Sequence, residues 1–197
     1  MKKILIPLTA VFFLASCGNN ASTKDSVEKA DSANEQKADT SSNSSAAVKE
    51  PIKTDEESTS FLVKAANGGM AEVALAQLAK EKATDTAVQH FADMMIADHS
   101  AANEKVKALA AERNVTLPAA PSDDEQKKAA DLGKKTGKDF DKDYVNAMVK
   151  GHEETLDLFK KVSGKTSDGA VKAFADNTIP TLEHHLMRIK DIKKGMK

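Results

Sequence analysis

Apolar residues recur every three or four positions through most of the chain beyond residue 54, with charged residues between them. This spacing places the apolar side chains along one face of an α-helix. It predicts four long helices and one short one, over about residues 55–81, 86–113, 123–132, 138–162 and 168–193. Nothing in the pattern has the two-residue period of a strand. The sequence therefore predicts an all-α four-helix bundle. A long connection with the short extra helix joins the second and third long helices.

Capping residues support the predicted helix ends. Thr54 with Glu57 fits a capping box at the start of the first helix, because the two side chains can satisfy each other's free backbone N–H groups. Ser122 with Glu125 fits the same motif at the start of the short helix. Gly133 follows that helix and can close it.

Two features interrupt the long helices. Gly68 and Gly69 lie inside the first one, where each glycine costs about 1 kcal/mol relative to Ala. The pair predicts a close approach of another helix or a local bend. Pro180 lies inside the last helix and is expected to kink it or split it in two, because proline lacks the backbone N–H that the helix needs.

The first residues have the pattern of an export signal. Lys2 and Lys3 precede an apolar run over residues 4–14, which is too short to span a bilayer core that needs about 20 residues. Residues 14–17 read Leu-Ala-Ser-Cys and are similar to the lipobox of bacterial lipoproteins, whose Cys is acylated and becomes the new N-terminus. We therefore expect a signal peptide over residues 1–16 and a lipid anchor on Cys17.

The segment after Cys17 differs in composition. Residues 18–53 are rich in Ser, Ala, Asn, Asp, Lys and Glu and contain no aromatic residue, so they offer little apolar surface to bury. We expect residues 17–53 to form a lipid-anchored disordered linker. As a coil of about 35 residues, it would hold the bundle domain, residues 54–197, about 30 Å from the membrane.

Charge and cysteine usage exclude several kinds of chemistry. The formal net charge is −1, and removing Lys2 and Lys3 with the signal peptide makes it about −3, so no basic nucleic-acid surface is expected. Cys17 is the only Cys, and its lipidation would leave the mature chain without disulfides or thiolate metal ligands. Gly18 and Asn19 replace the Asp that commonly retains lipoproteins in the inner membrane, which favours the outer membrane of the cell envelope.

Each long helix carries one metal-binding type of residue on its apolar face, in order Glu72, His99, His152 and His185. His99 lies about 14 residues before the end of its helix and His152 about 14 residues after the start of its own. At about 1.5 Å per residue, both lie about 21 Å from the same end of the bundle. Measured from the opposite end, Glu72 and His185 fall within one or two turns of them. The four side chains are therefore expected to meet in the bundle interior.

Imidazoles with one carboxylate suit a single transition-metal ion such as Zn, Fe, Cu or Mn, with Asp98 as a partner for the outer nitrogen of a histidine. A metal-free polar network of the same residues is the alternative. The Glu-x-x-His pairs of di-iron sites are missing, because Ile96, Val149 and Leu182 stand three residues before the histidines.

Two methionines leave one further option for the metal. Met95 and Met148 stand four residues before His99 and His152, a spacing that would also suit copper(I), although Met more often fills a core. His90 and His184 fall off the apolar faces and are expected to be solvated.

The sequence carries motifs at residues 61–73, 91–103, 140–141 with 144–152, and 180–182 with His185. These stretches resemble the domain-of-unknown-function family 4142, which comprises exported bacterial proteins with a ferritin-like helical bundle, and the resemblance covers about residues 55–192. The resemblance implies the ferritin-like fold. It also marks Glu72, Asp98, His99 and His152 together with His185 as positions that match family motifs. It implies no activity.

These observations predict an envelope lipoprotein, held to a membrane through Cys17, whose bundle binds a metal ion without catalysing a reaction. Two other functions stay open: a metal-dependent redox or stress-protection enzyme, and a metal-free interaction or structural module. No P-loop, GxGxxG motif or Ser-His-Asp arrangement favours another enzyme class.

Overall fold

The computed structural model describes residues 25–40 and 52–196, and within these ranges every element of regular secondary structure is a helix. The predicted signal peptide, Cys17 and the parts of the linker at residues 18–24 and 41–51 lie outside the described residues. The helices are α1 (Ser26–Thr40), α2 (Glu56–Lys82), α3 (Thr86–Glu112), α4 (Asp123–Gly133), α5 (Gly137–Lys165) and α6 (Gly169–Gly195). In the described ranges, no helix has the length and apolarity needed to cross a bilayer.

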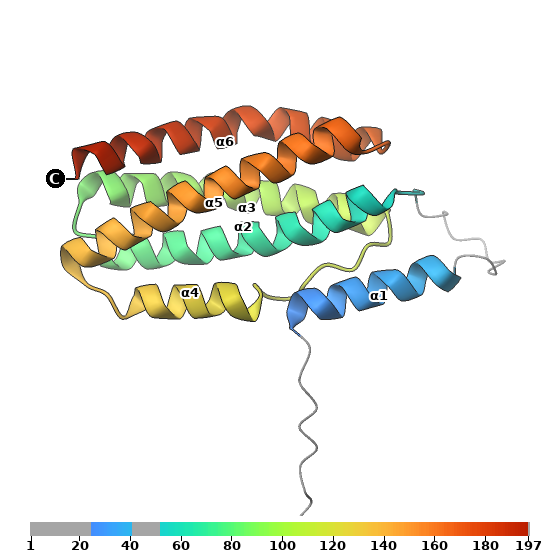
Figure 1. Ribbon diagram of the computed structural model, residues 1–197, viewed down its shortest axis with the longest axis horizontal. Helices are drawn as coiled ribbons and strands as arrows, with labels where there is room; N and C mark the ends of the chain where they lie inside the picture. Colours follow the sequence, from blue (N-terminus) through green and yellow to red (C-terminus); the bar gives the residue numbers. More distant parts are fainter. Residues whose placement is uncertain (1–24, 41–51, 197) are drawn as a thin grey trace, which may run out of the picture.

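Helices α2, α3, α5 and α6 form the four-helix bundle (Figure 1). The pair α2 and α3 and the pair α5 and α6 are each antiparallel. The long connection carries α4 back along the outside of the bundle, so α3 and α5 run in the same direction (Figure 1). One long crossover of this kind is the topology of the ferritin-like fold, and the predicted fold class is confirmed.

Aspartates cap three of the long helices. Asp55, Asp85 and Asp168 accept hydrogen bonds from free backbone N–H groups at the starts of α2, α3 and α6. The prediction that Thr54 caps α2 is wrong by one residue, because the Asp55 carboxylate takes the N–H of Ser58 at 2.7 Å. Ser122 caps α4 as predicted.

The glycine pair in α2 is explained by one of its two members. A Cβ atom on Gly69 would lie 2.0 Å from Oδ1 of Asn103 on α3, so α2 and α3 approach each other closely at this point. A Cβ atom on Gly68 would meet nothing within 4 Å. The close approach predicted from the glycines is therefore real at Gly69.

Pro180 does not split the last helix. α6 continues through it from Gly169 to Gly195. Of the two predicted outcomes, a kink or a split, the split is therefore wrong. Flanking residues are held by packing: Phe174, Ala175 and Leu182 are buried on the inner face of α6, and this contact stabilises the helix across the missing hydrogen bond.

The linker prediction is wrong over α1, because residues 26–40 form a helix and not a disordered segment. α1 is mostly polar and buries Ala30, and hydrogen bonds hold it to the connection after α3. Asn34 and Thr116 exchange two of these, Nδ2 to the main-chain oxygen at 3.0 Å and the main-chain N–H to Oδ1 at 2.7 Å. Ser26 donates to the carbonyl of Ala120 at 2.8 Å. α1 and α4 lie along the same side of the bundle (Figure 1).

The buried core falls into two apolar clusters along the bundle axis. The first, which we call the Phe91 cluster, includes Phe91, Met95, Tyr144, Met148 and Ile189. The second, the Phe159 cluster, has the following larger members: Phe61, Val106, Leu156, Phe159, Phe174 and Leu182. A layer of polar side chains separates them.

Candidate metal centre

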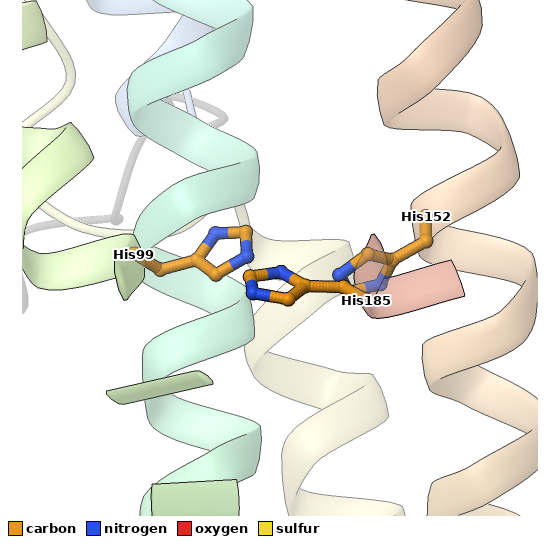
Figure 2. Close-up of side chains that lie close together, drawn as sticks. All are labelled: His99, His152 and His185. Carbon is orange, nitrogen blue, oxygen red and sulfur yellow. The ribbon is translucent and has the colours of Figure 1, made fainter. Parts of the chain in front are cut away.

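The polar layer is made by three histidines from three helices. His99 on α3, His152 on α5 and His185 on α6 are each buried, and their ring centres are 5.4–5.6 Å apart in every pairing. Figure 2 shows the three rings converging on one point between the helices. One nitrogen from each ring can be chosen so that the three lie within 4.8 Å of one another. The predicted convergence of these histidines is confirmed by this geometry.

Each ring is held from behind by an acceptor. Nδ1 of His99 lies 2.9 Å from Oε2 of Glu72, and Nε2 of His185 lies 2.9 Å from Oδ2 of Asp98. Nδ1 of His152 donates to the main-chain carbonyl of residue 148, one turn earlier on α5, at 2.9 Å. A carbonyl or a carboxylate can only accept, so these outer nitrogens carry the protons.

The remaining ring nitrogens therefore carry lone pairs. They are Nε2 of His99, Nε2 of His152 and Nδ1 of His185, and all three are buried without a hydrogen-bond partner among the described residues. Buried polar atoms in native proteins are seldom left without a partner. Three lone pairs that face one another in this way would be stabilised by a cation.

Burial sets the protonation state of two of the rings. It lowers the pKa of His152 and of His185 below the ordinary value of 6.5, because an apolar surrounding disfavours the charged imidazolium. At His185 the hydrogen bond to Asp98 opposes this effect without cancelling it. Both rings are neutral at pH 7, which is the form that binds metal ions.

Glu72 is ionised although it is buried. Burial alone would raise the pKa of its carboxyl, but the electrostatic attraction of the His99 ring and its hydrogen bond, with smaller contributions from the other two histidines, bring the pKa below its ordinary value of 4.5. Oε1 of Glu72 has no hydrogen-bond partner in the described part of the chain and lies 3.6 Å from Nδ1 of His152.

The structure thus divides the predicted site residues into two sets. The three histidines meet, whereas Glu72, which was predicted as a fourth ligand, lies behind His99 and outside the group whose ligand atoms converge. Asp98, predicted as an outer partner, contacts His185. His90 and His184 are exposed, as expected.

Among the described residues, no hydrogen bond joins the sulfur atoms of the two methionines to the histidines. Met95 and Met148 are fully buried in the Phe91 cluster, which agrees with core packing. Sequence reasoning missed two other contributors. The main-chain carbonyl of residue 148 carries no side-chain signal, and Phe91, whose ring centre lies 6.3 Å from those of His152 and His185, looks like any core residue.

A small cavity adjoins the polar layer on the side of the Phe159 cluster. Its volume is about 40 Å3, and Glu72 and His99 form part of its wall. Glu72 also lines a larger groove of about 550 Å3 between α2, α4 and α5. The carboxylate therefore stands between the buried histidines and two hollows.

Comparison with solved structures supports the fold. The chain is similar to a DUF305 fragment from Deinococcus radiodurans, with a TM-score of 0.64 and 11% sequence identity. The similarity covers 73% of this chain and 99% of the fragment. At that identity the likeness establishes the helical ferritin-like fold and nothing about the site. A search of curated proteins found no match.

A family model gives the remaining comparison. The model for the domain of unknown function DUF4142 matches residues 23–192. That range includes α1 and most of α6 as well as all three histidines. The chain belongs to the DUF4142 family.

Proposed function

We propose that this protein binds one divalent transition-metal ion between His99, His152 and His185. The observation that carries the proposal is the set of three buried ring nitrogens without partners, on three different helices. A core histidine that serves only packing needs a partner for both nitrogens, because an unsatisfied buried acceptor costs about 1–3 kcal/mol. Three such unpaired nitrogens that converge on one point favour a ligand-binding role for the histidines.

The outer contacts support the same conclusion. Metal-bound histidines almost always donate their second nitrogen to a carboxylate or a carbonyl, which fixes the ring. Here all three rings do so, to Glu72, to Asp98 and to the carbonyl of residue 148. Three nitrogen ligands in a tetrahedral arrangement around zinc lie about 3.3 Å from one another. Starting from separations within 4.8 Å, each ring would have to move by less than about 1 Å.

The chemistry of the donors indicates the class of ion. Imidazoles suit Zn, Cu, Fe and Ni, whereas Mn prefers oxygen ligands. Two nearby carboxylates, Glu72 and Asp98, would balance the charge of a divalent ion in a buried layer. These considerations favour zinc, copper(II) or iron(II), and they make copper(I) a poorer fit than the methionine spacing suggested.

Metal analysis tests the proposal. The purified protein would be stripped with a chelator, exposed to Zn(II) or Co(II) and freed of unbound ion before elemental analysis. We expect about one ion per chain. A ligand at about 100 times its Kd should also raise the free energy of unfolding by about 2.7 kcal/mol, which thermal denaturation can measure.

Adjacent histidines on α6 provide the control. His185→Ala should abolish binding, whereas His184→Ala changes an exposed neighbour and should leave the stoichiometry unchanged. Circular dichroism would establish that both variants are folded. Absence of stoichiometric metal in the folded wild-type protein would overturn the proposal and leave a metal-free polar network as the function of the layer.

We also propose that the protein is a lipoprotein of the bacterial cell envelope, anchored through Cys17 and held at the outer membrane. The support is the Leu-Ala-Ser-Cys sequence at residues 14–17 after an apolar run. Labelling of cells with a radioactive or clickable fatty acid should mark the wild-type protein and not Cys17→Ser. Persistent labelling of that variant would contradict the anchor.

A further inference from the structure

The two sides of the histidine layer differ in how tightly they are packed. On one side, the ring of Phe91 lies against His152 and His185, with both ring-centre distances at 6.3 Å. Met95 and Tyr144 fill the same side and are fully buried. This side leaves no room beside the rings, because side chains in such a cluster pack at close to crystal density.

The other side holds the small cavity. Its wall includes Gly68 and Gly69 from α2, Asn103 from α3, Thr155 from α5 and Thr178 from α6. Along its own helix, each of these residues lies on the side of the layer that leads to the Phe159 cluster. The cavity therefore borders the layer on the side of the Phe159 cluster, where it touches His99 and Glu72.

The volume of the cavity limits what it can hold. About 40 Å3 is room for two or three water-sized molecules, since one needs about 10–15 Å3 on this measure. Gly69 contributes to the space indirectly, because it lets the amide of Asn103 occupy the place of a Cβ atom. The amide and the two threonines give the wall polar groups, which a cavity built for apolar packing alone would lack.

The charge of the proposed ion, and not that of the cavity wall, favours an anion over a neutral molecule. The wall carries one charged group of each sign, because the exposed Lys64 and the Glu72 carboxylate both form part of it and offset each other. The three imidazoles are neutral ligands, and the Glu72 and Asp98 carboxylates contact the rings and not the ion, so a divalent ion would still attract an anionic ligand. Zinc sites with three protein ligands keep their fourth position for an exchangeable ligand.

We propose that the metal ion bound by the three histidines keeps one coordination position open toward the cavity for a small anion of one to three heavy atoms, with Asn103 positioned to donate a hydrogen bond to it. This inference rests on the proposed function, since it needs the metal in place. Its ligand class is small inorganic anions of the size of hydroxide or azide. Asn103 stands four residues after His99 on α3, so both side chains point to the same side of that helix.

Azide binding to the Co(II)-loaded full-length protein tests the inference. The visible absorption of Co(II) responds to a change of ligand. We expect azide to shift the spectrum with a saturable dependence on its concentration. Imidazole is too large for a cavity of about 40 Å3 and should produce no shift at the same concentrations.

A pair of neighbouring alanines gives matched variants. Ala102 forms part of the cavity wall, whereas Ala101 is exposed on the same turn of α3. Ala102→Val should weaken azide binding by about tenfold or more, because the added methyl groups fill the cavity. Ala101→Val should bind azide as the wild-type protein does.

The outcomes separate the two proposals. Failure of the folded protein to bind Co(II) would overturn the proposed function and the open position with it. Co(II) binding without any azide response in the wild-type protein would overturn the open position alone. Equal azide affinity in Ala102→Val would overturn the assignment of the cavity as the ligand's place. If Ala102→Val does not fold, the response to azide and imidazole in the wild-type protein still decides.

Discussion

Glu72 and Asp98 make the same contact in two different surroundings. Each carboxylate lies 2.9 Å from the outer nitrogen of one histidine of the layer. The Glu72 side chain is 8% exposed, whereas the Asp98 side chain is 45% exposed. Water screens the second contact and not the first, so equal distances conceal unequal energies. The buried contact is the one on which the metal-free fold depends.

The largest expected difference concerns stability without metal. Glu72→Ala leaves the buried Nδ1 of His99 without an acceptor and opens a hole, and should lower the free energy of unfolding by about 2–4 kcal/mol. Asp98→Ala removes a half-exposed carboxylate that water can replace beside the buried His185 ring, and it should cost less than about 1 kcal/mol. Urea denaturation of the chelator-treated proteins measures both. Equal losses would show that exposure does not separate the two contacts.

Substitution of Glu72 should also weaken metal binding more than substitution of Asp98, but the difference should be smaller than the difference in stability. Loss of an outer contact to a metal-bound histidine typically weakens metal binding by about 10–100-fold. We expect Glu72→Gln to fall in this range, because it also removes a buried charge near the ion. Asp98→Asn should weaken binding by less than about tenfold. Competition with a chromophoric chelator gives the two constants, and a weaker site in Asp98→Asn than in Glu72→Gln would reverse the comparison.

The dependence on pH tests the role of Asp98. Because burial lowers the pKa of His152 and His185, the unfolded chain takes up protons before the folded one as the pH falls below 6.5. Stability is therefore full above that pH and declines below it, by about 1.4 kcal/mol per pH unit for each such proton. Glu72 adds to this loss only below 4.5, its ordinary value.

Asp98 opposes the decline, because its hydrogen bond raises the pKa of His185 toward the ordinary value. Asp98→Asn should consequently steepen the loss of stability between about pH 7 and pH 5.5 while changing it little at higher pH. Urea midpoints across this range provide the measurement. A pH profile identical to that of the wild-type protein would contradict the assigned direction.

In contrast to the two carboxylates, the Tyr144 hydroxyl is a buried polar group without a hydrogen-bond partner among the described residues. Burial, followed by the charge of Glu72, raises its pKa. Tyr144→Phe removes the unsatisfied hydroxyl and should leave stability unchanged or raise it by less than about 1 kcal/mol. A loss of more than that would indicate that the hydroxyl has a partner in solution.

The apolar periodicity was sufficient to predict the bundle and the meeting of the histidines. His99, His152 and His185 each continue a stripe of buried residues, so their inward direction follows from helix geometry. The partners of the outer nitrogens did not follow in the same way. A rotation of the Glu72 side chain that moves its carboxylate by a few ångströms decides whether it contacts the proposed ion or Nδ1 of His99. The spacing of residues along a helix does not determine that rotation.

The error over α1 has a physical cause as well. Among the side chains described for this helix, only Ala30 is buried, and the helix has the polar composition of a disordered segment. Its stability comes from partners about 80 residues away, such as Thr116, which exchanges two hydrogen bonds with Asn34. A reading of local composition has no access to contacts of that sequence separation.

The docking of α1 also determines from which side the proposed lipid anchor would hold the molecule. Asp25 stands eight residues after Cys17, and eight residues span at most about 28 Å even when fully extended. The first turn of α1 meets the connection at Ala120 and Asp123, and that connection touches Asn67 in the middle of α2. The segment between Cys17 and α1 would therefore join the bundle at its side and not at one of its ends. A lipid anchor on Cys17 would thus attach the bundle from the side on which α1 and α4 lie (Figure 1).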